Sequence, residues 1–350
     1  MHSIYLKHSF NTLFLLGSAL VLSACGVEAE RQKRAQSPET QAKVQALIDK
    51  TQKQLVPIKG GSFWLGDFGV LMPSDGEGKF DEFPPPGPEL RSDEEHLPLT
   101  IGTDNKPPRW VTLDSFHMQA YKVTYEDFDV FVAANALPPH PPEGKETYHR
   151  IWADARTSGA IPVGVKWQQA KDYCLWLGKV TGQPFDLPTE AQWEYAASNG
   201  QNNTRKPFPT PTGLLKENQT HPSFKKKEEL IGRFGALYPV GLYAPSPGGL
   251  YDLVGNGFDW VNDWYAPDGY AQGDGHNLKG PETGTEKVLR GKSPGDGWSF
   301  GFPHLDRYHE NPEVSKFKSS GQEKIAPFSQ ESFRCVVNQT APLAPPKQLP

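Results

Sequence analysis

The chain has 350 residues, of which 36% are hydrophobic and 22% charged, and it holds 34 glycines and 34 prolines. This length suits one large domain or two small ones, and the glycine and proline content predicts a fold rich in loops. The formal net charge of −5 offers no basic surface for nucleic acid, so we expect no nucleic-acid partner.

Residues 1–25 read as an export signal. Lys7 precedes an apolar run, residues 13–22, which is too short for a permanent membrane span. The run ends in Leu-Ser-Ala-Cys, with Gly26 next, and this resembles the bacterial lipobox, whose cysteine is lipidated after cleavage. The resemblance implies lipidation at Cys25 and an outer membrane lipoprotein that faces the periplasm and meets the membrane through its lipid only. An ordinary signal peptide with a chance cysteine is the alternative.

Residues 26–54 are polar and are predicted to form a tether between the anchor and the folded part. Its second half can be helical, with Val44, Leu47 and Ile48 as a thin apolar stripe. The folded domain is predicted to begin at Leu55.

The first elements of that domain are expected within residues 56–66, as a strand, a Gly-Gly turn and a second strand. Residues 72–108 follow and are acidic and rich in proline. Long stretches without a period are usually functional loops or disorder, so disorder and a partner-binding loop both stay open.

Two helices are predicted in the next part of the chain. Residues 111–118 read as a strand, and Thr124 is the expected N-cap of a helix with Phe128, Phe131 and Val132 on one face. A second helix is expected over residues 167–179. Its inner face is predicted to hold Trp167, Ala170, Cys174 and Leu177.

Residues 187–197 read Leu-Pro-Thr-Glu-Ala-Gln-Trp-Glu-Tyr-Ala-Ala. Thr189 and Gln192 have the spacing of a capping box, so a helix is expected to start there. The polar residues 199–235 that follow are interpreted as a surface excursion.

Residues 249–265 combine three glycines, three acidic residues and five aromatic residues. This mixture fits neither an amphipathic helix nor a clean strand. We expect a rigid, irregular loop packed inside the domain, because glycine permits backbone conformations closed to other residues. Phe258, Trp260 and Trp264 are expected to fill the core, with a ligand-stacking box as the alternative.

Several of these segments resemble motifs of one family, the formylglycine-generating enzyme (sulfatase-modifying factor) family. They are residues 187–197, Gly-Asn-Gly-Phe-Asp-Trp at 255–260, Val-Leu-Arg-Gly-Lys-Ser at 288–293 and Ser-Phe-Arg-Cys at 332–335. The resemblance spans residues 55–337 and implies a single α+β domain, related to C-type lectin folds, with much irregular loop. It leaves 72–108, 199–235 and 294–330 as insertions and 338–350 as a proline-rich tail.

Active members of this family oxidise a substrate cysteine to formylglycine with O₂ and Cu(I), which is held by a Cys-x4-Cys pair after Arg-Gly-Gly-Ser. Counting onward from Arg290 places Asp296 and Gly301 at those positions, and the chain has three cysteines in all. Because Cu(I) is soft and requires thiolate ligands, we expect no copper and no catalytic residues for the family's oxidase chemistry.

Apart from Cys25 of the lipobox-like sequence, the chain has two cysteines, and these are expected to have a structural role. Cys174 and Cys335 fall at positions that form a disulfide in exported members of the family, and a periplasmic address permits one. The resemblance therefore implies a disulfide between them, and two unpaired buried thiols are the alternative.

A structural calcium site is a further implication of the resemblance. The family's ligand positions correspond to the Asp252 and Asp259 side chains and the Gly255 and Gly257 carbonyls, and such oxygens suit Ca²⁺. The alternative is that both aspartates cap turns. A second group, His304, Asp306 and His309, is read as loop residues, because its spacing fixes no metal geometry.

These features favour a non-catalytic envelope lipoprotein that binds a protein partner, since the fold is kept without the catalytic pair. By analogy with exported family members, the favoured role is an immunity protein that neutralises a type VI secretion toxin in the periplasm. Two alternatives stay open. One is a divergent oxidase or small-molecule tailoring enzyme, and the other is a structural accessory protein of the envelope.

Overall fold

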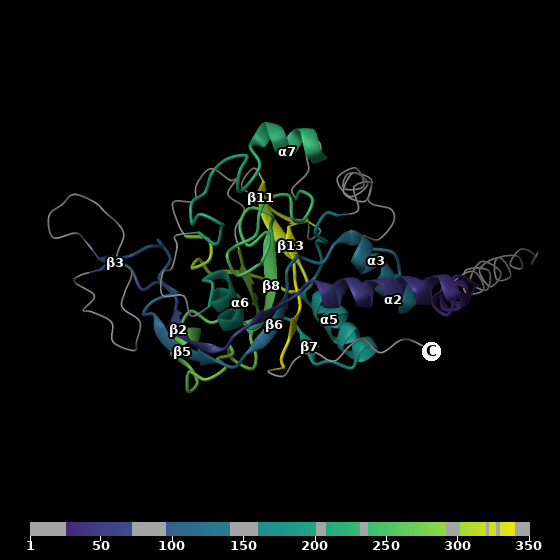
Figure 1. Cartoon of the computed structure of the whole chain (residues 1–350), viewed down its shortest axis with the longest axis horizontal. Coiled ribbons are helices and arrows are strands. Elements are labelled where there is room, and N and C mark those ends of the chain that lie inside the picture. Colours follow the sequence, from purple (N-terminus) through teal and green to yellow (C-terminus); the bar gives the residue numbers. More distant parts are fainter. Residues whose placement is uncertain are drawn as a thin grey trace, which may run out of the picture.

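The computed structural model (Figure 1) describes residues 26–71, 96–140, 160–200, 208–231, 237–291, 302–319, 322–326 and 330–339. Its helices are α2 (Pro38–Lys53), α3 (Tyr125–Ala134), α5 (Trp167–Thr181), α6 (Glu190–Ala197), α7 (Phe224–Ile231) and the 3-10 turn η2 (Gly269–Ala271). The strands of the first half are β1 (Leu55–Ile58), β2 (Gly61–Leu65), β3 (Val70–Leu71), β4 (His96–Leu97), β5 (Arg109–Leu113), β6 (Phe116–Gln119) and β7 (Phe185–Asp186). Those of the second half are β8 (Phe258–Trp264), β9 (Lys287–Arg290), β10 (Tyr308–Glu310), β11 (Ser315–Ser319), β12 (Gln322–Ala326), β13 (Glu331–Ser332) and β14 (Val336–Val337).

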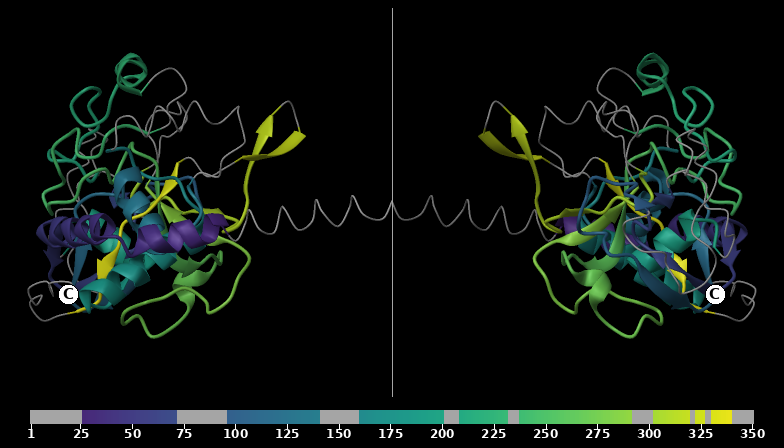
Figure 2. Two further views of the ribbon diagram at one scale, coloured as in Figure 1. Left: turned by 90° about the vertical axis from the view of Figure 1, so that its right-hand side faces the viewer. Right: turned by 90° about the vertical axis from the view of Figure 1, so that its left-hand side faces the viewer.

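Two four-stranded sheets, with helices packed beside them, form the centre of this α+β domain. One has the order β1-β6-β14-β7 and the other β10-β9-β8-β13. The last strands of the chain, β13 and β14, insert one into each sheet, β13 parallel to β8 and β14 antiparallel to β6 and β7. Short strands joined by long irregular segments give the fold class that the family resemblance implies. The hairpin of β11 and β12 stands away from the body in Figure 2.

The core consists of two large apolar clusters. The first surrounds α5, whose Ala170, Cys174 and Leu177 have no exposed surface, as the helical period predicts. The second lies between α6 and the sheets, with Trp193 and Tyr195 fully buried. Both clusters rely on aromatic side chains, which explains how a chain with few aliphatic residues still fills its interior.

Helix α2 belongs to the domain and is not a tether. Its stripe residues Val44, Leu47 and Ile48 are buried in the first core cluster beside α3. Lys50 Nζ also reaches the Asp127 carboxylate at 2.7 Å. The expected boundary at Leu55 is therefore corrected, because the apolar stripe of α2 finds its partner on the domain surface and is covered there.

The strand expected over residues 111–118 is divided into β5 and β6. At the break, Ser115 Oγ accepts a hydrogen bond from the Gly60 amide, and the Asp114 amide donates to Asn277 Oδ1. As a result β5 pairs with β2 and β6 with β1, so the two strands around Gly60 lie in different sheets. Gly60 is required there, because a Cβ would lie 2.4 Å from the Leu113 carbonyl oxygen.

Residues 249–265 are only half irregular. The first part runs through positive φ angles at Asp252 and at three glycines, as expected for a rigid loop. Its second part is β8, a central strand between β9 and β13, because both of its edges find backbone partners. Trp260 is buried, whereas Trp264 is half-buried and lies over the ammonium of Lys287 at 3.8 Å.

Parts of the three expected insertions have defined structure. The described end of the first, residues 96–108, is anchored on the buried Asp67 carboxylate, which accepts from the Leu99 and Thr100 amides. The second carries α7, on which Lys225 and Lys226 are exposed. The predictions for Cys25, Asp296 and Gly301 lie outside the described residues. Within the described ranges, no helix combines the length and apolar character needed to cross a bilayer.

Candidate functional site

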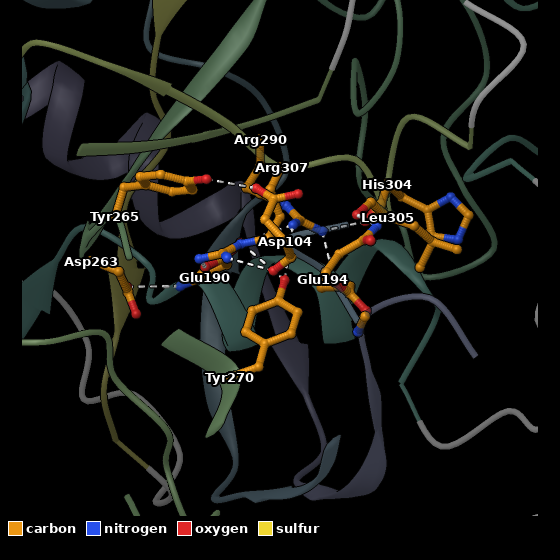
Figure 3. A network of polar contacts seen from close by, with 12 residues as sticks. Asp104, Glu190, Glu194, Asp263, Tyr265, Tyr270, Arg290, His304, Leu305 and Arg307 are labelled. Atoms are coloured by element: carbon orange, nitrogen blue, oxygen red, sulfur yellow. Dashed lines mark hydrogen bonds and ion pairs between the residues drawn. The ribbon is translucent and has the colours of Figure 1, made fainter. Parts of the chain in front are cut away.

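The family-like motifs meet in a buried network of ion pairs, drawn in Figure 3. Helix α6 begins at the capping box of Thr189 and Gln192, as predicted, and all eight of its residues are buried. Glu190 and Glu194 are one turn apart, so both carboxylates point to the same side. There the Arg290 guanidinium, at the end of β9, donates to Glu190 Oε1 at 2.9 Å and to Glu194 Oε2 at 2.7 Å.

A second arginine completes the network from the expected insertion 294–330. Arg307 donates to both Glu190 oxygens, from Nε at 2.8 Å and from Nη2 at 3.0 Å. Tyr270 donates its hydroxyl to the same carboxylate, and Figure 3 shows Glu190 enclosed by these groups. Arg290 also donates to the His304 carbonyl. The network therefore ties α6, β9 and residues 302–307 together.

Charge pairing keeps these groups ionised. Burial alone would raise the pKa of Glu190, but Arg307 and Arg290 hold it below its ordinary value. Burial would likewise lower the pKa of Arg290, whereas Tyr270 and the two glutamates raise it. The Glu190 carboxylate is thus a poor proton acceptor, and the network holds the end of β9 in place, after which the family places its copper ligands.

A smaller network surrounds Asp259 on β8. Asp259 Oδ2 accepts from Trp193 Nε1 at 2.9 Å and from Arg334 Nε at 3.0 Å, and Oδ1 lies 2.8 Å from Lys122 Nζ. All of these groups are buried. Arg334 also donates to the carbonyls of Ala120 and Tyr251, which holds the closing segment of the chain against the irregular loop.

The residues expected to bind calcium do not fit that ion. Asp259 is paired with two buried cations, which would repel Ca²⁺ and already occupy its oxygens. Asp252 accepts from the Gly241 amide at 2.8 Å and from Asn256, as an aspartate that stabilises a turn does. Gly257 lies against the Gln330 carbonyl, 2.5 Å from where a Cβ would be. The geometry supports the turn-forming alternative for Asp252, whereas Asp259 caps no turn and lies within β8, where it pairs with Lys122 and Arg334.

Cys174 and Cys335 form a disulfide with an S–S distance of 2.02 Å, the pairing that the family resemblance implies. It connects α5 to the segment before β14 inside the first core cluster.

The group of His304, Asp306 and His309 shows no metal geometry. His309 Nδ1 lies 2.9 Å from Glu286, and the His309 ring stacks on Tyr265. Among the residues that the structure places, no group of three or more His, Cys, Asp or Glu is arranged to hold a metal ion.

Asp263, on β8 beside Glu190, makes the stability of the fold sensitive to pH. Burial and then Glu190 raise the pKa of Asp263 from 3.8 to about 6. Because the folded state binds the proton more tightly, stability falls as the pH rises through this window, by an amount on the order of 3 kcal/mol. Asp263→Asn is expected to flatten the pH dependence of the unfolding free energy between pH 4 and pH 7 in urea titrations. The exposed Asp268→Asn serves as the control, and an unchanged slope in Asp263→Asn would refute the assignment.

Comparison with known proteins identifies this arrangement of motifs. Residues 40–339 match the Sulfatase-modifying factor enzyme 1-like domain. The chain belongs to this family. The match begins inside α2, in agreement with the packing of that helix into the domain.

Relatives within the family include formylglycine-generating enzymes. That of Streptomyces coelicolor is 30% identical over 68% of this chain and 77% of its own length. The mouse enzyme is 29% identical over 56% of this chain, which spans 63% of the mouse protein. A mouse protein named inactive C-alpha-formylglycine-generating enzyme 2 is 34% identical over 31% of this chain and 33% of its own length. The solved structure of PvdO from Pseudomonas aeruginosa shares the fold, with a TM-score of 0.54 and 20% identity over 81% of this chain and 94% of PvdO.

Proposed function

We propose that this chain is a non-catalytic lipoprotein of the cell envelope, in which the formylglycine-generating-enzyme-like fold binds a protein partner. In this proposal Cys25 carries the lipid, the domain faces the periplasm from the outer membrane, and the partner is a type VI secretion toxin that the protein neutralises as an immunity protein. The proposal assigns no catalytic residue and no copper.

The distribution of thiols carries the proposal. The family's oxidase chemistry requires two thiolates near each other to bind Cu(I). This chain has three cysteines, of which Cys174 and Cys335 are joined to each other. The third cysteine, Cys25, lies in the lipobox-like sequence, more than two hundred residues before the Arg290 motif in the chain. A copper-binding pair therefore cannot be assembled within one chain while the disulfide is intact.

Exposed apolar groups on the insertions support a protein partner. Ile101 is 86% exposed and Phe224 is 76% exposed, although both are large hydrophobic side chains. Ile101 lies in the described end of the 72–108 insertion, and Phe224 begins α7 in the 199–235 insertion. We take these two side chains as the anchors of the proposed interface, since buried apolar side chains at the centre of an interface contribute much of its binding energy. The acidic segment at 72–95 would add electrostatic steering toward a basic toxin.

A competition experiment tests this function. A strain that lacks the gene for this protein and the gene of the toxin proposed as its partner is grown with its parent, which still delivers the toxin. We expect the deletion strain to lose most of its survival against this parent. A plasmid copy of the gene should restore survival, and a parent without the secretion apparatus should cause no loss. Equal survival with both parents would contradict the immunity role.

Surface variants then locate the binding face. Ile101→Ala combined with Phe224→Ala is expected to abolish most of the protection. Leu175→Ala is the matched control, because Leu175 is a similarly apolar side chain, 48% exposed, on α5 and outside the insertions. Loss of protection in both variants would point to reduced stability, so the abundance of each variant is measured in the same cells.

A further inference from the structure

A polar cavity lies beside the first turn of α6. Glu190 and Glu194 of this helix face the ion network, and Gln192, midway between them, points to the other side because each helical residue turns by about 100°. On that side Gln192 lines a cavity of about 270 Å³, together with residues of β5, β7 and β8 and with Asn338 after β14. The cavity and the Arg290 network therefore lie on opposite sides of α6.

The cavity has an apolar floor and a polar rim. Phe116 and Leu187 line it, and both side chains are buried. Asp114, Lys279 and Asn338 also line it and are exposed. A ligand can therefore enter from solvent, pass polar groups and come to rest on apolar side chains, as in most binding sites for small molecules.

Hydrogen-bond donors around the cavity are left for a ligand. Asn338 Oδ1 accepts from Gln192 Nε2 at 2.8 Å, so the Asn338 amide hydrogens stay available. Thr189 Oγ1 accepts from the Gln192 amide at 3.1 Å and keeps its own hydrogen to donate. Within the described ranges, no residue forms a hydrogen bond or ion pair with the Lys279 ammonium.

Hydrogen-bond acceptors lie beside these donors. Asp186 Oδ1 pairs with Lys171 Nζ at 2.6 Å, while Asp186 Oδ2 accepts only a long contact of 3.4 Å from Asn262. Asp114 Oδ2 accepts from Asn277 Nδ2 at 2.8 Å. Because each carboxylate oxygen can accept two hydrogen bonds, both aspartates keep the capacity to bind a ligand.

This mixture of groups selects among ligand classes. An anion would be repelled by Asp114 and Asp186, and a cation by Lys171 and Lys279. An apolar ligand would cover the polar groups without pairing them, which costs free energy. A neutral molecule with several hydroxyl groups fits, because each hydroxyl both donates and accepts.

We propose that this cavity binds one neutral sugar ring of a saccharide. Its volume of about 270 Å³ lies just below the usual range for ligand pockets, about 300–1,000 Å³, so it suits a single ring. The ring carbons pack on Phe116 and Leu187, and the ring hydroxyls bond with Asp186, Thr189 and Asn338. This site does not depend on the proposed toxin partner.

Titration of the purified protein with monosaccharides tests the proposal. Glucose, galactose, mannose and N-acetylglucosamine are added one at a time, and binding is followed by saturation-transfer-difference NMR. We expect saturable binding of at least one of these neutral sugars, and weaker binding of the anion glucose 6-phosphate and of the cation glucosamine. Absence of binding by all four neutral sugars would overturn the proposal, and so would charged sugars that bind as well as the neutral ones.

A matched pair of variants locates the bound sugar. Asn338→Asp keeps the acceptor for Gln192 but removes the amide donor, and it is expected to weaken binding by about tenfold. Because Asn338 is exposed, this variant should remain folded. Asn218→Asp makes the same change at an exposed position outside the cavity and should leave binding unchanged. Binding of equal strength in Asn338→Asp and the wild-type protein would place the sugar elsewhere and would also overturn the proposal.

Discussion

Replacement of Arg290 by alanine is expected to destabilise the protein by about 3–5 kcal/mol, because breaking a buried ion pair leaves an uncompensated buried charge. Arg290 has no exposed surface and pairs with Glu190 and Glu194. Glu190 keeps Arg307 after the change, whereas Glu194 loses its buried cation. Urea titration of the unfolding free energy measures the effect.

Two further variants show whether charge is the cause. Glu194→Gln added to Arg290→Ala should recover part of the lost stability, since the buried side chain that no longer pairs with Arg290 then carries no charge. The exposed pair of Lys43 and Glu39, 2.7 Å apart, is the matched control. Lys43→Ala should cost less than about 1 kcal/mol. An effect of Arg290→Ala as small as that of Lys43→Ala would refute the structural role of the network.

Loss of the disulfide is expected to have an effect of similar size. Cys174 and Cys335 are 161 residues apart in sequence, and in the chain-entropy model a loop of this length contributes roughly 5 kcal/mol. Reductant should therefore lower the urea midpoint strongly. The double variant Cys174→Ala with Cys335→Ala should show the lowered midpoint with or without reductant. A midpoint that does not respond to reductant in the wild-type protein would contradict the expected contribution.

Local signals in the sequence predict several elements well. Thr124 and Thr189 cap α3 and α6 as expected, because the capping residues and their partners lie three positions apart. The buried face of α5 follows from the helical period of its apolar residues. These features depend on residues that are close together in the sequence. The fold class of the whole domain is predicted by the resemblance to the family's motifs.

The sequence does not predict the ion networks, because the partners in each network come from distant parts of the chain. Nothing in the sequence near Glu190 indicates that Arg307, in an insertion, will meet it. A signal is nevertheless present, since Glu190 and Glu194 lie in a helix that is apolar apart from them and Gln192, and Arg290 directly follows two apolar strand residues. Charges at buried positions of a helix or strand predict buried partners.

The calcium site is another case in which the local sequence does not reveal partners from distant segments. The carboxylates and carbonyls at 252–259 have suitable chemistry, but Lys122 and Arg334 reach Asp259 from other segments and neutralise it. The prediction that α2 is part of a tether differs from the structure for a related reason. The sequence shows the apolar stripe of Val44, Leu47 and Ile48, but the surface that covers it belongs to α3 and α5, which come later in the chain.

The central claim is that the family fold is retained here without the thiol pair that holds copper. The most direct test is to load the purified protein with Cu(I) and incubate it in air with a cysteine-containing peptide substrate of formylglycine-generating enzymes, beside an active enzyme. We predict that the peptide cysteine remains unchanged, as measured by mass spectrometry, and that a Cu(I) chelator removes the metal without resistance. Catalytic conversion of that cysteine to the formylglycine aldehyde would contradict the account.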